Sequence, residues 1–410
     1  MSNAGSAGAA ARQQLARRLS RAVASLEDPA TPMVVVDLDA FDANAGDLRR
    51  RANGTRIRVA SKSLRVPALL SRVLAVPGFS GVLGYTLREA LWLVRNDVTD
   101  DVVLGYPTVD RAALRDLLGD ARARRSITLM VDDAAHLAMV EDLDPGGEPV
   151  RMAVDIDAGL RLGRGAALQQ VGPKRSPLYD TVEVTAFARE VVRRGHRLVG
   201  VMTYEGQVAG VPDAVPHKRA KSLVVRRLKS ASVAQLATRR AEIARALGEI
   251  TELEFWNAGG SGSVETTVAD PHVTEVAAGS GLLVPGLFDH YRSFDPVPAA
   301  FYGLPVVRRP GGDVVTVAGG GFIASGPTGK DRSPLPWAPP DLHLTGLEGA
   351  GEVQTPLTGA GTRLLQVGDW VWFRHAKSGE IAEHTNTVHL LAGDTIVDSV
   401  PSYRGLGLAW

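Results

Sequence analysis

The chain has no cysteine among its 410 residues. Disulfide bonds, thiolate metal sites and cysteine nucleophiles are therefore excluded. It also has no uninterrupted run of about 18 apolar residues, so the sequence predicts no membrane-spanning helix. Chemistry in this protein must use lysine, histidine, serine, tyrosine or carboxylate side chains.

The chain also has little net charge. The 46 lysines and arginines nearly balance the 45 aspartates and glutamates, which leaves a formal charge of +1. Nucleic-acid binding normally needs a basic surface, so nucleic acid is not an expected partner. The length is enough for one barrel-sized domain and a smaller companion.

The first 27 residues are rich in Ala and Arg and poor in acids, as transit peptides are. They have no apolar core segment, however. Leu15, Leu19, Val23 and Leu26 follow helical spacing, which favours a surface helix docked on the main body. We expect residues 1–30 to form a helical extension and the protein to be cytoplasmic.

Nine short apolar or β-branched runs alternate with helical patterns. They cover 33–39, 57–61, 81–85, 101–106, 127–132, 151–157, 198–204, 253–259 and 274–279. This alternation is typical of βα units around a parallel sheet. A closed barrel needs eight strands, so one run is wrong or belongs elsewhere.

After about residue 290 the helical period is lost, and Gly/Pro-rich turns separate short strands. This texture predicts an antiparallel β domain. The predicted fold is α/β: a (β/α)8 TIM-type barrel over 40–290 with a C-terminal antiparallel β domain over 291–410. The proline-rich stretch from Ser325 to Pro340 predicts a loop.

A basic stretch runs from Lys218 to Arg240. Its apolar residues, Leu223, Leu228, Val233 and Leu236, have the mixed spacing of a helix packed on a barrel. The charges therefore indicate the solvated face of a crossover helix more than a binding patch.

Lys62 closes the predicted strand in RVASKS, where a barrel strand delivers its side chain to the C-terminal mouth. A lone lysine there is usually an ordinary surface residue. A lysine that attacks a carbonyl must lose its proton, and the apolar neighbours Val59 and Ala60 favour that loss.

Two glycine-serine turns follow the last two predicted barrel strands: Gly259 to Ser263, and Gly279 to Gly281. Consecutive glycines let backbone N–H groups approach an anion, and barrels commonly bind phosphate at this position. Ordinary flexible turns are the alternative. Asp155, Asp157 and Arg161, and Tyr204 with Glu205, also stand at predicted strand ends; an arginine or tyrosine there can tune a cofactor ring.

The ordered set of these motifs resembles the fold-type III pyridoxal-phosphate enzymes, in the branch of D-threonine aldolases and D-serine dehydratases, with alanine racemase-like proteins. The resemblance runs from about Val34 to Arg404 and rests on six short stretches. They are VVDLDAFDAN, RVASKS, the DxGxRxG stretch from Asp157 to Gly163, YEG, GGSGS and EVAAGS.

The resemblance implies a fold and a cofactor site. Residues 31–39 would join the β domain, which leaves eight strands for the barrel. Lys62 would hold pyridoxal phosphate as a Schiff base. Gly260, Ser261, Gly262, Gly279 and Ser280 would bind the phosphate, with Tyr204 and Arg161 beside the ring. A homodimer is also implied.

The chain departs from the family where aldolases and dehydratases hold a metal on a His-x-Asp or His-x-Cys pair. Here that stretch is His375-Ala376-Lys377. A protonated lysine cannot ligate a divalent cation, so we predict no metal site. We hypothesise that the Lys377 ammonium takes the metal's place and contacts the substrate hydroxyl or carboxylate, with His375 as base for the hydroxyl.

The function expected from the resemblance is lyase action on a D-configured β-hydroxy amino acid, by retro-aldol cleavage. A D-serine dehydratase-like elimination is one alternative. A racemase or epimerase is another, with Lys62 and Tyr403 as the two bases. Two further possibilities are a non-catalytic carrier of pyridoxal phosphate and a barrel enzyme that acts on sugar phosphates without pyridoxal phosphate.

Overall fold

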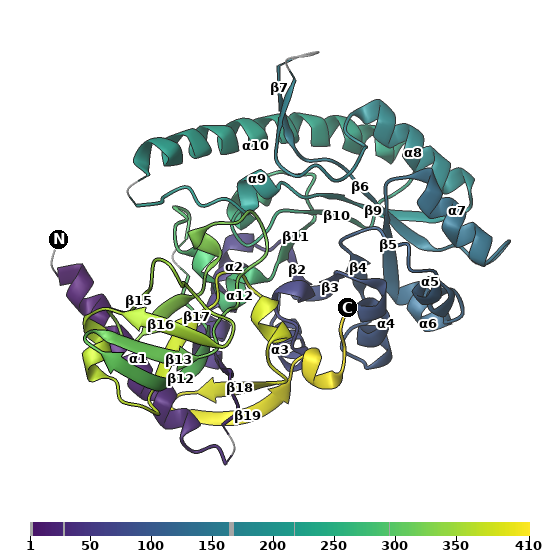
Figure 1. Cartoon of the computed structure of the whole chain (residues 1–410). Coiled ribbons are helices and arrows are strands. Elements are labelled where there is room, and N and C mark those ends of the chain that lie inside the picture. Colours follow the sequence, from purple (N-terminus) through teal and green to yellow (C-terminus); the bar gives the residue numbers. More distant parts are fainter. Residues whose placement is uncertain (1–2, 28, 164–167, 217, 295) are drawn as a thin grey trace.

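The computed structural model describes residues 3–27, 29–163, 168–216, 218–294 and 296–410. It has two parts, an α/β barrel and a β domain packed beside it (Figure 1). No helix among the described residues is both long and apolar enough to cross a membrane.

Eight parallel strands close into a barrel in the order β10-β11-β2-β3-β4-β5-β6-β9. Their bounds are β2 Arg56–Ala60, β3 Phe79–Gly84, β4 Val102–Leu104, β5 Ile127–Val131, β6 Arg151–Asp155, β9 Arg197–Thr203, β10 Phe255–Ala258 and β11 Glu275–Ala278. Each overlaps one of the predicted runs. The predicted TIM-type barrel is therefore confirmed.

The ninth run forms β1 (Met33–Asp37), which lies outside the barrel. It pairs antiparallel with β12 (Ala300–Gly311) and parallel with β18 (Thr387–Ala392). The strand ends at Asp37, two residues before the predicted end, because the Asp37 carboxylate accepts the backbone N–H groups of Asp39 and Ala40 and starts helix α2 (Leu38–Ala52).

Helices cover the outside of the barrel (Figure 1). They include α3 Pro67–Leu74, α4 Leu87–Arg95, α5 Arg111–Leu118, α6 Ala121–Ser126, α7 Ala134–Leu143 and α8 Thr181–Arg193. Aspartate side chains cap α5 to α8 by accepting backbone N–H groups of the first turn, and Thr86 does the same for α4. Local sequence thus sets where each helix begins.

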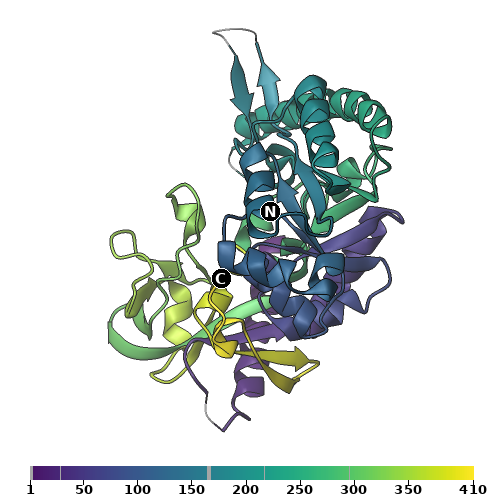
Figure 2. The same ribbon diagram turned by 90° about the vertical axis from the view of Figure 1, so that its right-hand side faces the viewer.

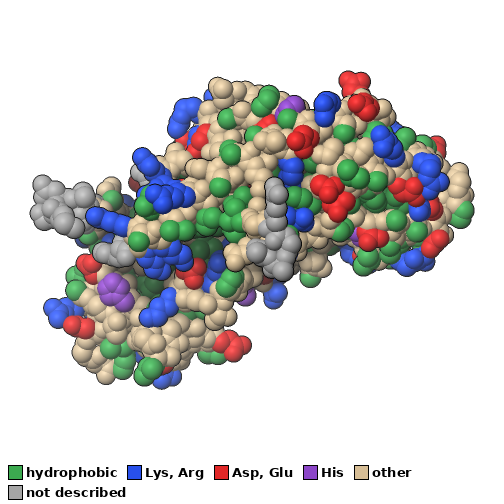
Figure 3. Space-filling model, turned by 90° about the horizontal axis from the view of Figure 1, so that it is seen from above, with side chains coloured by type: hydrophobic (Ala, Val, Ile, Leu, Met, Phe, Trp, Pro, Cys, Tyr) green, Lys and Arg blue, Asp and Glu red, His purple; other side chains and the backbone are tan. Residues whose placement is uncertain are grey.

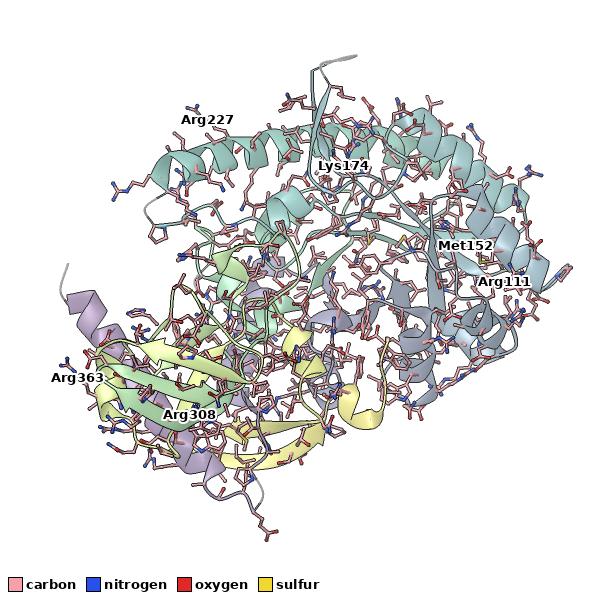
Figure 4. The ribbon with its side chains drawn as sticks, in the orientation of Figure 1. Arg111, Met152, Lys174, Arg227, Arg308 and Arg363 are labelled. Atoms are coloured by element: carbon pink, nitrogen blue, oxygen red, sulfur yellow. The ribbon has the colours of Figure 1, made fainter. Side chains whose placement is uncertain are left out.

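The basic stretch lies in the long helix α10 (Arg219–Gly248). Arg227 stands on the outer side of α10 (Figure 4), and Lys and Arg side chains gather at the end where α10 begins (Figure 3). Two residues differ from the expectation that the apolar side chains pack on the barrel and the basic ones face solvent. Leu223 is exposed because the beginning of α10 extends past the barrel, and Arg240 is buried in an ion pair with Glu205.

The β domain is a nine-stranded, mostly antiparallel sheet, as predicted. Besides β1, β12 and β18 it contains β13 Val314–Ala318, β14 Leu335–Ala338, β15 His343–Leu344, β16 Gln354–Thr358, β17 Trp370–Arg374 and β19 Thr395–Pro401. The predicted Ser325–Pro340 loop is thus partly wrong. Strand β14 tolerates Pro336 because it is an edge strand that pairs with β17 alone.

Helix α1 (Asn3–Val23) packs on this sheet (Figure 1). Figure 2 shows the β domain beside the barrel from another side. Leu19 and Val23 are buried in one cluster with Phe301 and Trp372. The apolar face expected from the spacing of the leucines therefore covers the β domain.

One seam closes the barrel, where β11 pairs with β2 from Glu275↔Arg56 to Ala278↔Val59. Arg58 and Glu275 form a fully buried ion pair across it, with Nε–Oε1 and Nη2–Oε2 distances of 2.7 and 2.9 Å. Burial alone would lower the pKa of Arg58, but the carboxylates of Glu275 and Asp101 outweigh it and raise that pKa.

Glu275→Gln would leave the Arg58 guanidinium without its buried counter-charge. We expect the free energy of unfolding, measured by urea denaturation, to fall by about 3–5 kcal/mol. Glu254→Gln is the matched control, because its ion pair with Arg151 is about half exposed on the Glu254 side and should contribute at most about 1 kcal/mol. Equal losses in the two variants would contradict a structural role for the buried pair.

Candidate active site

A cavity of about 320 Å³ lies at the C-terminal mouth of the barrel, where the β domain packs against it. This volume is in the range of about 300–1,000 Å³ that small-molecule sites occupy. Basic and hydroxyl side chains, glycines and one carboxylate line it, together with an apolar wall that includes Leu287, Phe288 and Tyr291.

Lys62 lies in the short 3-10 turn Ser61–Ser63 that directly follows β2, and its side chain lines the cavity. Its Nζ donates a 2.5 Å hydrogen bond to the hydroxyl of Tyr106, which follows β4. Burial raises the pKa of the Tyr106 hydroxyl, but the ammonium of Lys62 outweighs it, aided by Arg175 and Lys377, and the net shift is downward.

Glu205 fixes the turn after β10 through hydrogen bonds. This buried carboxylate follows β9 and accepts the Gly259 N–H at 3.0 Å and the Thr267 hydroxyl at 2.8 Å. Arg240 neutralises it at 3.2 Å. The first glycine-serine turn is therefore tied to the neighbouring strand end.

The two glycine-serine turns touch each other. The Ser261 hydroxyl accepts the backbone N–H groups of Gly279 and Gly281 at 3.2 and 2.9 Å. A side chain on Gly279 would place its Cβ 2.6 Å from the Ala60 carbonyl oxygen, so only glycine fits between the turn and β2. In the described part of the chain, the N–H groups of Ser261 and Ser280 have no acceptor. Free N–H donors of this kind can bind an anion.

Most of the predicted site residues meet in this cavity. It is lined by Lys62, Tyr204, Gly260, Ser261, Gly279, Ser280 and Lys377. Gly262 is not a lining residue, and a Cβ there would lie 2.5 Å from the Tyr291 ring.

Arg161 does not reach the cavity. It lies on β7 (Leu160–Leu162), which pairs with β8 (Gln169–Val171), and its guanidinium carbon is 3.5 Å from the centre of the Tyr179 ring. Arg175 lines the cavity instead, as do Arg65 and Arg332, and its guanidinium carbon is 5.5 Å from the centre of the Tyr204 ring. No strand or helix pattern surrounds Arg175 in the sequence, so nothing there distinguished it.

His375 also lies outside the cavity lining. Its side chain is buried, its Nε2 has no partner among the described residues, and burial lowers its pKa to about 3. It is therefore neutral at ordinary pH. Tyr403 is also absent from the lining; its hydroxyl donates to Glu89 at 2.8 Å.

Lys377 reaches the cavity from the β domain. Its ammonium is 3.2 Å from the Glu380 carboxylate and donates to the Ser325 hydroxyl. Arg332 and Ser378 line the same side. Among the described residues, no three His, Asp or Glu side chains are grouped to hold a metal ion.

The family model for the alanine racemase N-terminal domain matches residues 36–284, which is more than half of the chain. The chain therefore belongs to the alanine racemase N-terminal domain family. This places it among the fold-type III pyridoxal-phosphate enzymes, the class that the motifs predicted.

Solved structures share the fold over nearly the whole chain. D-threonine aldolase from Filomicrobium marinum has a TM-score of 0.70 and 18% identity, over 92% of this chain and 95% of that one. D-threo-3-hydroxyaspartate dehydratase from Delftia sp. HT23 has a TM-score of 0.72 and 20% identity, over 93% and 98%. Alanine racemase from Clostridium difficile 630 has a TM-score of 0.59 and 13% identity, over 92% and 99%. Comparison with curated protein sequences gave no match.

The cavity fits the cofactor that this family implies. It offers an amine at Lys62 and, in the same cavity, two N–H groups without acceptors among the described residues, on turns that glycine keeps open. These groups match an aldehyde and a phosphate, respectively.

The β domain touches the backbone of Lys62 itself through Gly379. This residue has a φ of +87°, and a Cβ there would lie 1.9 Å from the Lys62 carbonyl oxygen. We expect Gly379→Ala to lower the free energy of unfolding by about 1–3 kcal/mol more than Gly368→Ala does. Gly368 has a similar φ of +96° but open space around it. Alanine at Gly368 therefore adds the backbone strain without the clash, and the difference between the two variants measures the clash alone. If urea denaturation gave equal losses of unfolding free energy for the two variants, Gly379 would not be in close contact with the Lys62 carbonyl.

Proposed function

We propose that this protein is a pyridoxal-phosphate-dependent lyase that acts on a D-configured β-hydroxy amino acid. The observation that carries the proposal is the position of Lys62, whose amine enters the same cavity as the two glycine-serine turns. The fold likeness to an aldolase and a dehydratase supports the reaction class, although those activities belong to the named proteins.

Each part of the cofactor has residues suited to it. Lys62 would hold its aldehyde carbon, and the turns at Gly260-Ser261 and Gly279-Ser280 would bind its phosphate. Tyr204 and Arg175 would flank its ring, Arg175 in the role that the sequence suggested for Arg161. When bound, pyridoxal phosphate supplies an electron sink that stabilises negative charge at the substrate Cα.

Lys377 would bind the substrate's hydroxyl or carboxylate. It approaches from the β domain, opposite the barrel strands, and Glu380 and Ser325 hold its ammonium in place. An ammonium can orient an anionic or hydroxyl oxygen as a point charge, which is part of what a metal does there. Our proposal gives no step to His375, because its side chain is outside the cavity lining and its lowered pKa makes it a weak base.

Retro-aldol cleavage is the reaction that we favour, and elimination of the β-hydroxyl is the alternative. Racemisation needs a base on each face of the substrate, and Tyr403, the candidate for the second, is bound to Glu89 instead. A carrier without catalysis would have little use for a β domain that reaches the cavity. A homodimer and a cytoplasmic location stay predictions.

The reaction is tested by a screen of D- and L-amino acids with product identification. We expect an aldehyde and glycine from a D-β-hydroxy amino acid, and no turnover by Lys62→Ala. Ammonia and a keto acid would mean elimination. The lyase assignment would be overturned if the substrate lost optical purity and gained solvent deuterium at Cα while neither an aldehyde with glycine nor ammonia with a keto acid was formed.

The role of Lys377 is tested by Lys377→Gln. Loss of one charged contact to the substrate should lower kcat/KM by on the order of 10- to 100-fold, about 1.4–2.8 kcal/mol. Lys330→Gln is the control, because Lys330 is exposed on the neighbouring segment and does not line the cavity.

Metal analysis of the purified protein gives the complementary test. We expect turnover to survive exhaustive chelation. Stoichiometric manganese or zinc that turnover requires would contradict the role of Lys377.

A further inference from the structure

Tyr106 is in direct contact with the amine of Lys62. The Nζ–Oη distance is 2.5 Å, and no other side chain among the described residues is hydrogen-bonded to Nζ. Both residues line the cavity, and they follow different barrel strands, β2 and β4. Sequence reasoning missed Tyr106 because nothing in DVVLGY distinguishes its tyrosine from a packing residue.

The charges around Tyr106 favour its ionised form. Lys62 is on one side, Arg175 lies 5.8 Å from the ring centre, and Lys377 faces it from the β domain. Burial opposes ionisation, and the three cations overcome that effect, so the pKa of Tyr106 is lowered. Tyr204, which lines the same cavity, differs: burial raises its pKa and the net shift is upward.

Covalent chemistry at Lys62 requires proton transfers at Nζ. When the ammonium nitrogen bonds to a carbonyl carbon with a double bond, it gives up two protons, and the carbonyl oxygen leaves with both as one molecule of water. The charge is conserved, and no oxidant or reductant is needed. A group that accepts a proton at the nitrogen and donates one to the departing oxygen speeds this exchange.

We propose that Tyr106 is a catalytic residue, the acid and base that relays protons to and from Lys62 Nζ whenever this nitrogen forms or breaks a bond to a carbonyl carbon. The inference rests on the proposed function, since it takes the carbonyl to be that of pyridoxal phosphate. Two other polar groups of the cavity are engaged elsewhere. Ser261 accepts two backbone N–H groups, and Lys377 is held by Glu380 and Ser325.

The first test follows covalent capture of pyridoxal phosphate by the cofactor-free enzyme. Samples are reduced with borohydride at timed intervals, and the modified lysine is located by peptide mass. Tyr106→Phe should slow capture at Lys62 by on the order of 100-fold, while the final extent of capture stays the same. An unchanged rate in Tyr106→Phe, with normal capture by the unaltered enzyme, would overturn the relay alone. Failure of the unaltered enzyme to modify Lys62 would overturn the proposed function, and the relay with it.

The second test needs no cofactor. Ultraviolet difference absorbance should show one tyrosine of the cofactor-free enzyme that ionises at lower pH than the others. This signal should be lost in Tyr106→Phe and kept in Tyr204→Phe. Its survival in Tyr106→Phe would contradict the charge environment on which the relay depends. Should Tyr106→Phe fold poorly, 3-fluorotyrosine at position 106 keeps the hydroxyl and must move the signal to lower pH.

Discussion

Closure of the barrel between β11 and β2 is the constraint on which the site depends. The first and last barrel strands are more than 200 residues apart in the chain, and their pairing places Lys62 beside the Gly279-Ser280 turn. The hydroxyls of Ser63 and Ser280 are 3.1 Å apart across this seam. The buried Arg58–Glu275 pair bridges the same two strands deeper in the barrel. A cavity that combines the Lys62 amine with backbone N–H groups free to bind an anion therefore exists only once the barrel is closed.

The β domain completes what the barrel begins. Gly379 lies against the backbone of Lys62, and Arg65, three residues further along, is paired with Glu383. Lys377 enters the cavity from the same segment. The segment that packs against Lys62 thus also carries the side chains expected to contact the substrate. Substitutions in this segment can therefore change the reaction while the barrel residues around the cofactor stay the same.

The sequence predicted much of the fold because its signals are local. Each barrel strand is a short apolar run, and each glycine-serine turn directly follows one, so their positions at the C-terminal mouth follow from the architecture. The same reasoning placed Lys62 correctly in the cavity. The count of nine runs left one that was wrong or lay elsewhere, and the family resemblance assigned residues 31–39, which contain β1, to the β domain.

The remaining features depend on long-range packing. Arg161 follows a strand end, yet the β7–β8 hairpin carries it away to Tyr179, and Arg175 from an irregular loop takes the cavity position. His375 stands two residues before Lys377, but its side chain turns into the core, where burial keeps it neutral. Neither side-chain direction nor burial can be derived from spacing alone, and the contact between Lys62 and Tyr106 joins two separate strands.

The central claim is that Lys62 and the two glycine-serine turns bind pyridoxal phosphate together. A crystal structure of the protein grown with pyridoxal phosphate tests this most directly. The account predicts continuous density from Lys62 Nζ to the cofactor, with the phosphate at the backbone N–H groups of Ser261 and Ser280. A cofactor bound to another lysine, or a phosphate held away from both turns, would contradict it.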